Sequence, residues 1–499
     1  MGVNESDRAS EYRLKKWPHK VLWSSKNLSY TKGSKPPEAR SSIQCFCQGL
    51  VSDNKTDVIQ LRLGAVCFCE CIREFLFAIF ENLLKMVRTY GIIRYERWCT
   101  MKLITRNQYL EKLIHVIGTP DIKVITGVRR SGKSKLLEAF KNHIEQNVPN
   151  HNIIQINFNL PEFDHLLEYR PLYDYIHSQY AADKENFVLI DEVQMCTDFE
   201  KAINGLHASE KFDIYITGSN AFLLSSDLAT LFTGRTFEIK VFPFSFGEYM
   251  QYFGYSDRYA AVDTYMIEGG MAGSYLYKDQ EAKYDYIADV FNTLIVRDIR
   301  KKYKIRNMQL MDRLVDFLMD NISNLTSARN ITNTFSGLHE KVNHVTISSY
   351  IQYLCNAFAF YKIRRYDIKG KKYLSSNDKY YLSDHTFRYA KLGTKNMDYG
   401  RILENVVAIE LLRRGYEVYV GVLYKKEIDF VAIKRNEKIY IQVSDNISDN
   451  KTFEREVSPL LQIKDAYPKM IIARTRHDEY QYEGVRIVDI ADWLLDLQK

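Results

Sequence analysis

A glycine-rich loop between an apolar strand and an amphipathic helix constrains the fold of this chain more than any other feature. Residues 123–140 are KVITGVRRSGKSKLLEAF, and residues 127–134 fit the pattern G-x-x-x-x-G-K-S. The apolar run before the loop predicts a buried strand, and the apolar residues after it recur at helical spacing. Glycines let backbone amides turn toward an anion at the positive end of the helix. The pattern predicts a site for nucleotide phosphates.

Each position of the loop has a predicted role. The residues expected to surround the phosphates of ATP are Gly127, Val128, Arg129, Arg130, Ser131, Gly132, Lys133 and Ser134. The Lys133 ammonium is expected to bridge the β- and γ-phosphates and to act in catalysis, and the Ser134 hydroxyl to bind Mg²⁺. The predicted cofactors are therefore ATP and Mg²⁺.

A second element, NFVLIDEV at residues 186–193, predicts a buried strand that ends in two acids. Asp191 is placed to bind the magnesium ion, and Glu192 to activate the attacking water. Alone, an apolar run followed by Asp-Glu is a common strand end. Behind a complete phosphate loop, it predicts the metal-binding and catalytic acids.

A third strand and an arginine complete the predicted site. The strand DIYITGSN at residues 213–220 ends in small polar residues, and Asn220 is expected to contact the γ-phosphate or orient water. Arg235 is a candidate arginine finger, which would neutralise charge that develops on the γ-phosphate. The alternative interpretation of Arg235 is an ordinary surface arginine on a loop.

Several segments together resemble one superfamily. GVRRSGKS, VLIDEVQ, ITGSN, GRTFEIKVFPFSFGEY, EGGMAGSY and VRDIRKKYKIRN are similar to segments of bacterial and archaeal AAA+ ATPases, in which an AAA domain precedes a DUF4143 region. The resemblance covers about residues 101–475. It implies an additional-strand P-loop core. The alternation of strands and helices independently predicts an α/β fold, with a parallel sheet and helices on both faces.

The expected domain order follows from these segments. We expect an N-terminal extension over residues 1–100, a P-loop AAA domain over 101–260, a helical linker or lid over 261–307, a winged-helix-like domain over 308–390 and a restriction-endonuclease-like α/β domain over 391–499. Met101 begins the regular pattern and is a candidate natural start. The alternative is a genuine flexible extension.

The middle of the chain carries helical periodicity followed by two strands, the pattern of a winged helix. A basic run on the predicted wing comprises Arg364, Arg365, Lys369, Lys371 and Lys372. These side chains could contact nucleic-acid phosphates, or they could form a solvated hairpin that packs one domain on the next. We favour the hairpin because the body of the chain is nearly neutral.

The C-terminal segment GRILENVVAIELLRRGYEVYVGVLYKKEIDFVAIKRNEKIYIQVS resembles the restriction-endonuclease-like fold. Glu404 and Asp429, with Glu427 beside them, stand near the positions where that fold holds a divalent metal. Gln442 stands where a second acid is needed, and Ser444 where a lysine is needed. Since neither supplies the missing charge, we predict a module without efficient cleavage.

Charge and cysteine content are uneven along the chain. The net charge is +7, and residues 1–100 hold 16 Lys and Arg against 10 Asp and Glu, whereas the other 399 residues hold 53 against 52. The body therefore lacks the basic excess of a typical nucleic-acid binder. Six of the eight cysteines lie in the first hundred residues at spacings that do not suit zinc. Two cysteines in the body suit a reducing, cytoplasmic compartment.

Three functions remain open at this stage. The first is an ATPase whose nucleotide state repositions the winged-helix and C-terminal modules. The second is a nucleic-acid processing enzyme in which the P-loop controls a weak nuclease, and the third is an ATP-dependent regulator that binds DNA or protein without cutting. The expected partners are a nucleotide and an unidentified DNA or protein, with homo-oligomerisation open. No apolar run reaches the roughly 18 residues of a membrane span, so no membrane partner is expected.

Overall fold

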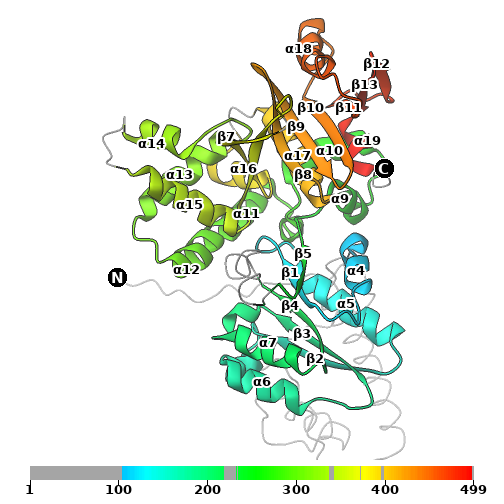
Figure 1. Cartoon of the computed structure of the whole chain (residues 1–499), viewed down its shortest axis with the longest axis vertical. Coiled ribbons are helices and arrows are strands. Elements are labelled where there is room, and N and C mark those ends of the chain that lie inside the picture. Colours follow the sequence, from blue (N-terminus) through cyan, green and yellow to red (C-terminus); the bar gives the residue numbers. More distant parts are fainter. Residues whose placement is uncertain are drawn as a thin grey trace, which may run out of the picture. The chain divides into compact units, whose positions relative to one another are not determined.

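The computed structural model describes residues 104–218, 232, 234–336, 342–370, 372–394 and 398–496. The chain divides into two compact units, Met1–Trp98 and Cys99–Lys499. Figure 1 shows the described residues of the second unit in colours from blue to red. The predicted residues Asn220 and Lys371 lie outside the described residues.

A five-stranded parallel sheet forms the first half of this unit (Figure 1). Its strands are β1 (Ile122–Thr126), β2 (His151–Asn157), β3 (Glu185–Asp191), β4 (Asp213–Thr217) and β5 (Thr236–Lys240). They lie in the order β2-β3-β4-β1-β5, and all neighbours run parallel. The strands read as continuous apolar runs because a parallel sheet is covered on both faces.

Helices cover both faces of this sheet. One core joins strand residues such as Val124 to α6 (Tyr169–Ser178) and α7 (Phe199–Ala208). The other joins Ile125 to α4 (Asn107–Ile114) and α5 (Lys133–Asn147). Since successive strand residues point to opposite faces, neighbouring positions of β1 enter different cores. The predicted fold class, a parallel sheet with helices on both faces, is confirmed.

A run of helices follows the sheet. They are α9 (Phe246–Phe253), α10 (Arg258–Glu268), α11 (Gln280–Thr293), α12 (Lys301–Tyr303), α13 (Met308–Asp320), α14 (Ala328–Ser336) and α15 (His344–Asn356). Short helical turns lie at η2 (Pro161–Leu166), η3 (Val193–Met195) and η4 (Ala272–Leu276), and η5 (Leu294–Arg300) is a π-helix. One large core contains residues of these helices and of the C-terminal strands.

An eight-stranded mixed sheet forms the C-terminal part. Its strands are β6 (Phe360–Asp367), β7 (Lys372–Leu382), β8 (Glu417–Leu423), β9 (Lys426–Lys434), β10 (Glu437–Ser444), β11 (Lys469–Ala473), β12 (Tyr480–Tyr482) and β13 (Val485–Asp489). Their order is β12-β13-β11-β10-β9-β8-β6-β7. The helices are α16 (Thr386–Leu392), α17 (Tyr399–Arg413), α18 (Asn450–Leu461) and α19 (Ile490–Leu495).

The hairpin expected as the wing belongs to this sheet. Strands β6 and β7 pair antiparallel, and β6 also pairs parallel with β8. The predicted boundary at residue 390 therefore falls inside one continuous sheet rather than between two domains. The sequence pattern could show the hairpin, but not its pairing with a strand some fifty residues later, because that pairing is non-local.

Candidate functional site

The glycine-rich loop follows β1 and leads directly into α5. Gly127 has a φ of +143° and Gly132 a φ of +95°, conformations that favour glycine. A Cβ atom on Gly127 would lie 2.0 Å from the carbonyl oxygen of Val241, which follows β5. Two different constraints, backbone conformation and close packing, therefore require glycine at this position.

Lys133 lies inside the loop that precedes it. Its Nζ donates to the carbonyl oxygens of Gly127 at 2.9 Å and of Val128 at 3.1 Å. Burial lowers the pKa of Lys133, and the nearby carboxylates of Glu192 and Asp191 oppose that shift. The ammonium is thus held against the loop backbone, next to the N-terminus of α5, where the partial positive charge of the helix favours an anion.

The acids lie at the carboxyl ends of neighbouring strands. Asp191 ends β3 and accepts hydrogen bonds from the hydroxyls of Thr217, which ends β4, and Ser134. Burial raises the pKa of Asp191, and these two hydrogen bonds oppose the rise. The structure therefore brings together Ser134 and Asp191, the two residues predicted to bind magnesium.

Glu192 adopts an unusual backbone conformation next to this pair. Its φ is +56° and its ψ +47°, in the left-handed region that non-glycine residues rarely occupy. Its amide donates to the Thr217 hydroxyl at 3.1 Å, and its carboxylate accepts from the Gln194 amide. Such strain recurs at functional sites. The Glu192 carboxylate lies close enough to Lys133 to favour the charged ammonium.

The residues present fit a magnesium nucleotide. Ser131 Oγ in the loop is buried and has no hydrogen-bond partner among the described residues. Elsewhere in the site, the Asp191 carboxylate accepts from the Ser134 hydroxyl and lies close enough to Lys133 to affect its pKa. A hydroxyl and a carboxylate are oxygen ligands that suit Mg²⁺. When bound, the ion would supply charge neutralisation on the phosphates through Ser134 and Asp191.

The two arginines of the loop differ in their surroundings. Arg129 Nη1 lies 3.8 Å from Asp298 Oδ2 on the π-helix η5, and both side chains are largely buried. Arg130 is exposed and has a φ of +64°. An acid from a later segment therefore reaches the loop, which no local pattern indicated.

Arg235 lies at the amino-terminal end of the parallel strands, whereas the loop lies at their carboxyl end. It directly precedes β5, and its carbonyl accepts from the amide of Ile122, the first residue of β1. The loop begins beyond the last residue of β1. At about 3.3 Å per strand residue, Arg235 is about 20 Å from the loop, too far for an arginine side chain to span. Its exposed side chain cannot serve the loop of its own chain in this conformation.

Thr217 and Asp298 are the site residues that sequence analysis missed. Thr217 is the last residue of β4, and the strand order places it beside Asp191. The polar end of the segment ITGSN was a usable signal for Thr217, but the prediction named Asn220, three residues later. Asp298 had no local signal because its contact with the loop spans many residues.

A second polar cluster occupies the C-terminal module. Lys379 on β7 is buried, and its Nζ lies 2.8 Å from Glu404 Oε1, 2.7 Å from Glu427 Oε1 and 3.7 Å from Asp429 Oδ1. Burial opposes protonation, but the Glu404, Asp429 and Glu427 carboxylates raise the pKa of Lys379. Tyr381 also donates to Glu404 at 2.6 Å. The acids expected near a metal surround a lysine instead.

The neighbouring residues complete this arrangement. Gln442 accepts from the Asp429 amide at 2.7 Å and donates to Glu456 Oε2 at 2.8 Å, beside a pocket of about 360 Å³. Ser444 donates to the carbonyl of Asn446. Burial and Glu404 raise the pKa of Asp429 to about 8. A lysine from the hairpin and an additional acid from α18 thus belong to this cluster, and the local motif contained neither of them.

Replacing the central lysine tests its role. Lys379→Met leaves buried carboxylates facing one another, so the free energy of unfolding should fall by about 3–5 kcal/mol. The control is Lys362→Met. Lys362 lies on the neighbouring strand β6 and pairs with Asp378, and it is more exposed than Lys379. Its replacement should lower the free energy of unfolding by less than about 1 kcal/mol. Urea unfolding of both variants measures the difference. Equal effects would show that Lys379 does not hold the cluster together.

Two broader features concern the described part of the chain only. Within it, no group of three or more His, Cys, Asp or Glu side chains is arranged to hold a metal ion by itself. Among the same residues, none of the helices has the length and apolar character that crossing a membrane requires.

The strand order, the loop and the acid at the end of β3 define a P-loop fold, and family comparison gives the same class. A family model described as an AAA domain matches residues 119–250. A second, a domain of unknown function designated DUF8612, matches residues 259–398. These matches do not show the DUF4143 region that the sequence resemblance implied. DUF8612 matches the segment expected as linker and winged helix.

Two relatives share most of the chain. An uncharacterized protein of Haemophilus influenzae is 37% identical over 398 residues, which cover 79% of this chain and 99% of that protein. An uncharacterized protein of Methanocaldococcus jannaschii is 28% identical over 390 residues, covering 74% of this chain and 85% of that protein. The chain belongs to the same family as the H. influenzae protein, a family with an AAA+ ATPase-like domain.

Solved structures show only remote likeness. The replication initiator DnaA bound to AMPPCP and single-stranded DNA is 16% identical with a TM-score of 0.28, covering 50% of this chain and 89% of that one. C. elegans PCH-2 is 18% identical with a TM-score of 0.21, covering 34% and 43%. These scores carry no argument about function.

Proposed function

We propose that the protein is a Mg²⁺-dependent ATPase whose nucleotide state repositions the modules that follow its AAA domain. The observation that carries the proposal is the convergence of Lys133, Ser134, Asp191 and Glu192 at one edge of the parallel sheet. The Lys133 ammonium, the metal ligands Ser134 and Asp191 and the base Glu192 would thus act in one site, as phosphoryl transfer to water requires. Release of phosphate from ATP, dependent on Mg²⁺, is the direct test.

The chain's own groups have distinct tasks in this mechanism. The loop amides and Lys133 would bind and orient the phosphates, and Ser134 and Asp191 would hold a magnesium ion, which would supply neutralising charge. Glu192 orients the attacking water and accepts its proton. The Gln194 amide, which donates to that carboxylate, keeps it in the conformation that faces the loop.

Glu192→Gln should separate binding from turnover. The amide retains the size and hydrogen bonding of the acid but cannot accept the proton, so hydrolysis should slow about 100-fold while ATP affinity is kept. Glu185→Gln is a matched control because Glu185 begins the same strand at its opposite, exposed end. Phosphate release and binding of a fluorescent ATP analogue measure both quantities. Full turnover in Glu192→Gln would remove the base from the mechanism.

The C-terminal cluster favours a non-cutting module over a nuclease. Lys379 already neutralises the carboxylates that a catalytic metal would need. We therefore propose that ATP hydrolysis drives or controls binding to a partner, in the cytoplasm, rather than cleavage of nucleic acid. Stimulation of ATP hydrolysis by duplex DNA would identify a DNA partner, and its absence would favour a protein. Metal-dependent nicking that Asp429→Ala abolishes would contradict this interpretation.

A further inference from the structure

The segment between β5 and α9, residues 241–245, lies directly against the glycine-rich loop. The Val241 amide donates to the Thr126 carbonyl at 2.8 Å, and the Val241 carbonyl leaves no room for a side chain on Gly127. The next residues, 242–244, lead toward α9, and Phe244 lies in the same hydrophobic core as Val128 of the loop. Because the loop packs on this backbone, a shift of the segment must shift the loop.

Arg106 connects the segment to the loop through hydrogen bonds to both. Its Nη1 donates to the Ser131 carbonyl at 2.7 Å, and its Nη2 donates to the Phe242 carbonyl at 2.9 Å. Glu248 on α9 binds the same guanidinium at 2.7 Å and 2.8 Å. Although burial opposes ionisation, Arg106 lowers the pKa of Glu248. This buried, charged pair fixes one side of the segment.

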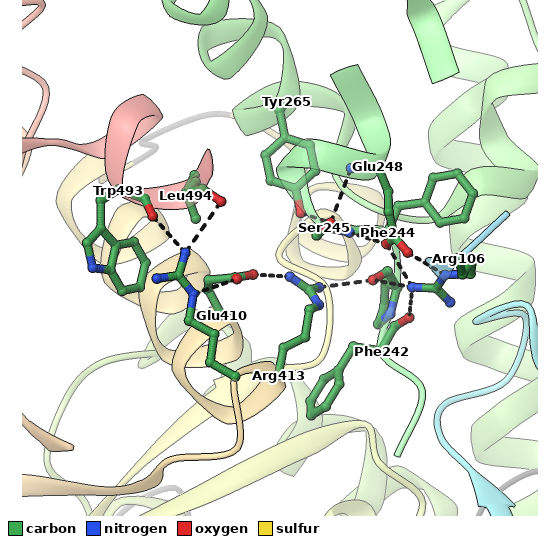
Figure 2. Close-up of polar contacts among 12 residues, drawn as sticks. Arg106, Phe242, Phe244, Ser245, Glu248, Tyr265, Glu410, Arg413, Trp493 and Leu494 are labelled. Carbon is green, nitrogen blue, oxygen red and sulfur yellow. Dashed lines mark hydrogen bonds and ion pairs between the residues drawn. The ribbon is translucent and has the colours of Figure 1, made fainter. Parts of the chain in front are cut away.

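Arg413 holds the same segment from the other side. It comes from α17 in the C-terminal module, and its Nη2 donates to the Pro243 carbonyl at 2.9 Å. Figure 2 shows the guanidinium groups of Arg106 and Arg413 reaching the segment from opposite directions. Arg413 is buried and forms an ion pair with Glu410 one turn earlier on α17. Arg106 Nη2 also donates to the Pro243 carbonyl, at 3.4 Å, so that carbonyl accepts hydrogen bonds from arginines of two different parts of the chain.

Arg414 provides a natural comparison. It binds the other oxygen of Glu410 at 2.9 Å, so Glu410 has two arginine partners. Among the described residues, Arg414 also donates to the carbonyls of Trp493 and Leu494. Arg413 ends α17 and Arg414 is the next residue. The two arginines share a counter-ion, but differ in whether they contact the segment that packs on the loop.

We propose that Arg413 is a positioning residue through which the C-terminal module sets the conformation of the phosphate loop. The connection runs from α17 through the Pro243 carbonyl and the shared segment to Arg106 and the Ser131 carbonyl. The proposal rests on the proposed nucleotide binding for its function. Since coupling between two sites is reciprocal, nucleotide at the loop and a partner on the C-terminal module would each change the affinity for the other.

The test compares Arg413→Met with Arg414→Met. Each removes one arginine from Glu410 and leaves the other. Arg413→Met should weaken binding of a fluorescent ATP analogue with Mg²⁺ at least about 5-fold, whereas Arg414→Met should change it less than about 2-fold. The double variant Arg106→Met, Arg413→Met should bind no more weakly than Arg106→Met alone, because both act through one connection. Equal affinities in the two arginine variants would overturn the proposal.

A second measurement does not depend on nucleotide. In the nucleotide-free protein, hydrogen exchange of the amides at residues 127–134 should be faster in Arg413→Met than in Arg414→Met or wild type. If wild type fails to bind the analogue, the proposed function fails, but this comparison still decides the inference. Should Arg413→Met not fold, Arg413→Lys keeps the charge and is expected to show the same faster exchange. Wild-type exchange in Arg413→Lys would then refute the proposed connection.

Discussion

Lys133→Ala is expected to abolish ATP binding and hydrolysis. The Lys133 ammonium is the group that the loop holds at its mouth, through the carbonyls of Gly127 and Val128. Of the other cations in the loop, Arg129 is paired with Asp298 and Arg130 is exposed. Alanine supplies no charge to bridge the phosphates. Isothermal titration with ATP and Mg²⁺, together with phosphate release, measures the loss.

Lys135→Ala is the matched control for this loss. Lys135 lies two residues later on α5, is more than half exposed and pairs with Glu138. A surface pair of this kind contributes less than about 1 kcal/mol, so this variant should bind and hydrolyse ATP as wild type does. Normal affinity and turnover in Lys133→Ala would contradict the assignment of the nucleotide site.

Arg235→Ala is expected to slow hydrolysis about 10³-fold with little change in ATP affinity, if the arginine serves the site of a neighbouring subunit. The geometry leaves only that route, because Arg235 lies at the far edge of its own sheet. Arg170→Ala, which removes an exposed arginine paired with Asp174 on α6, should have no effect. Steady-state kinetics at saturating ATP measure the change.

Mixing variants distinguishes the arginine finger from a surface residue. Arg235→Ala protein retains an intact loop, and Lys133→Ala protein retains an intact arginine. Under conditions that favour assembly, the mixture should therefore recover part of the activity that each variant lacks. Undiminished turnover in Arg235→Ala would make it an ordinary loop arginine. Impaired turnover that no mixture restores would argue against action between subunits.

The sequence predicted the candidate nucleotide site because the signals for it are local. Gly127, Gly132 and Lys133 lie within one short loop, and their spacing reflects backbone geometry that a strand followed by a helix imposes. Asp191 was equally clear because an apolar run predicts a buried strand, and its end must lie at the sheet edge. The parallel sheet with two helical layers followed from the same periodicity.

Tertiary structure decided what depends on pairing between distant segments. The strand order placed Thr217 beside Asp191. The parallel pairing of β1 and β5 placed Arg235 at the end of the strands that lies opposite the loop. Pairing of β6 with β8 joined the expected wing to the C-terminal sheet and brought Lys379 among the carboxylates. Arg413 reached the segment behind the loop in the same way. Local patterns report which face of an element is buried, but the partner that buries it is chosen by the packing of the whole chain.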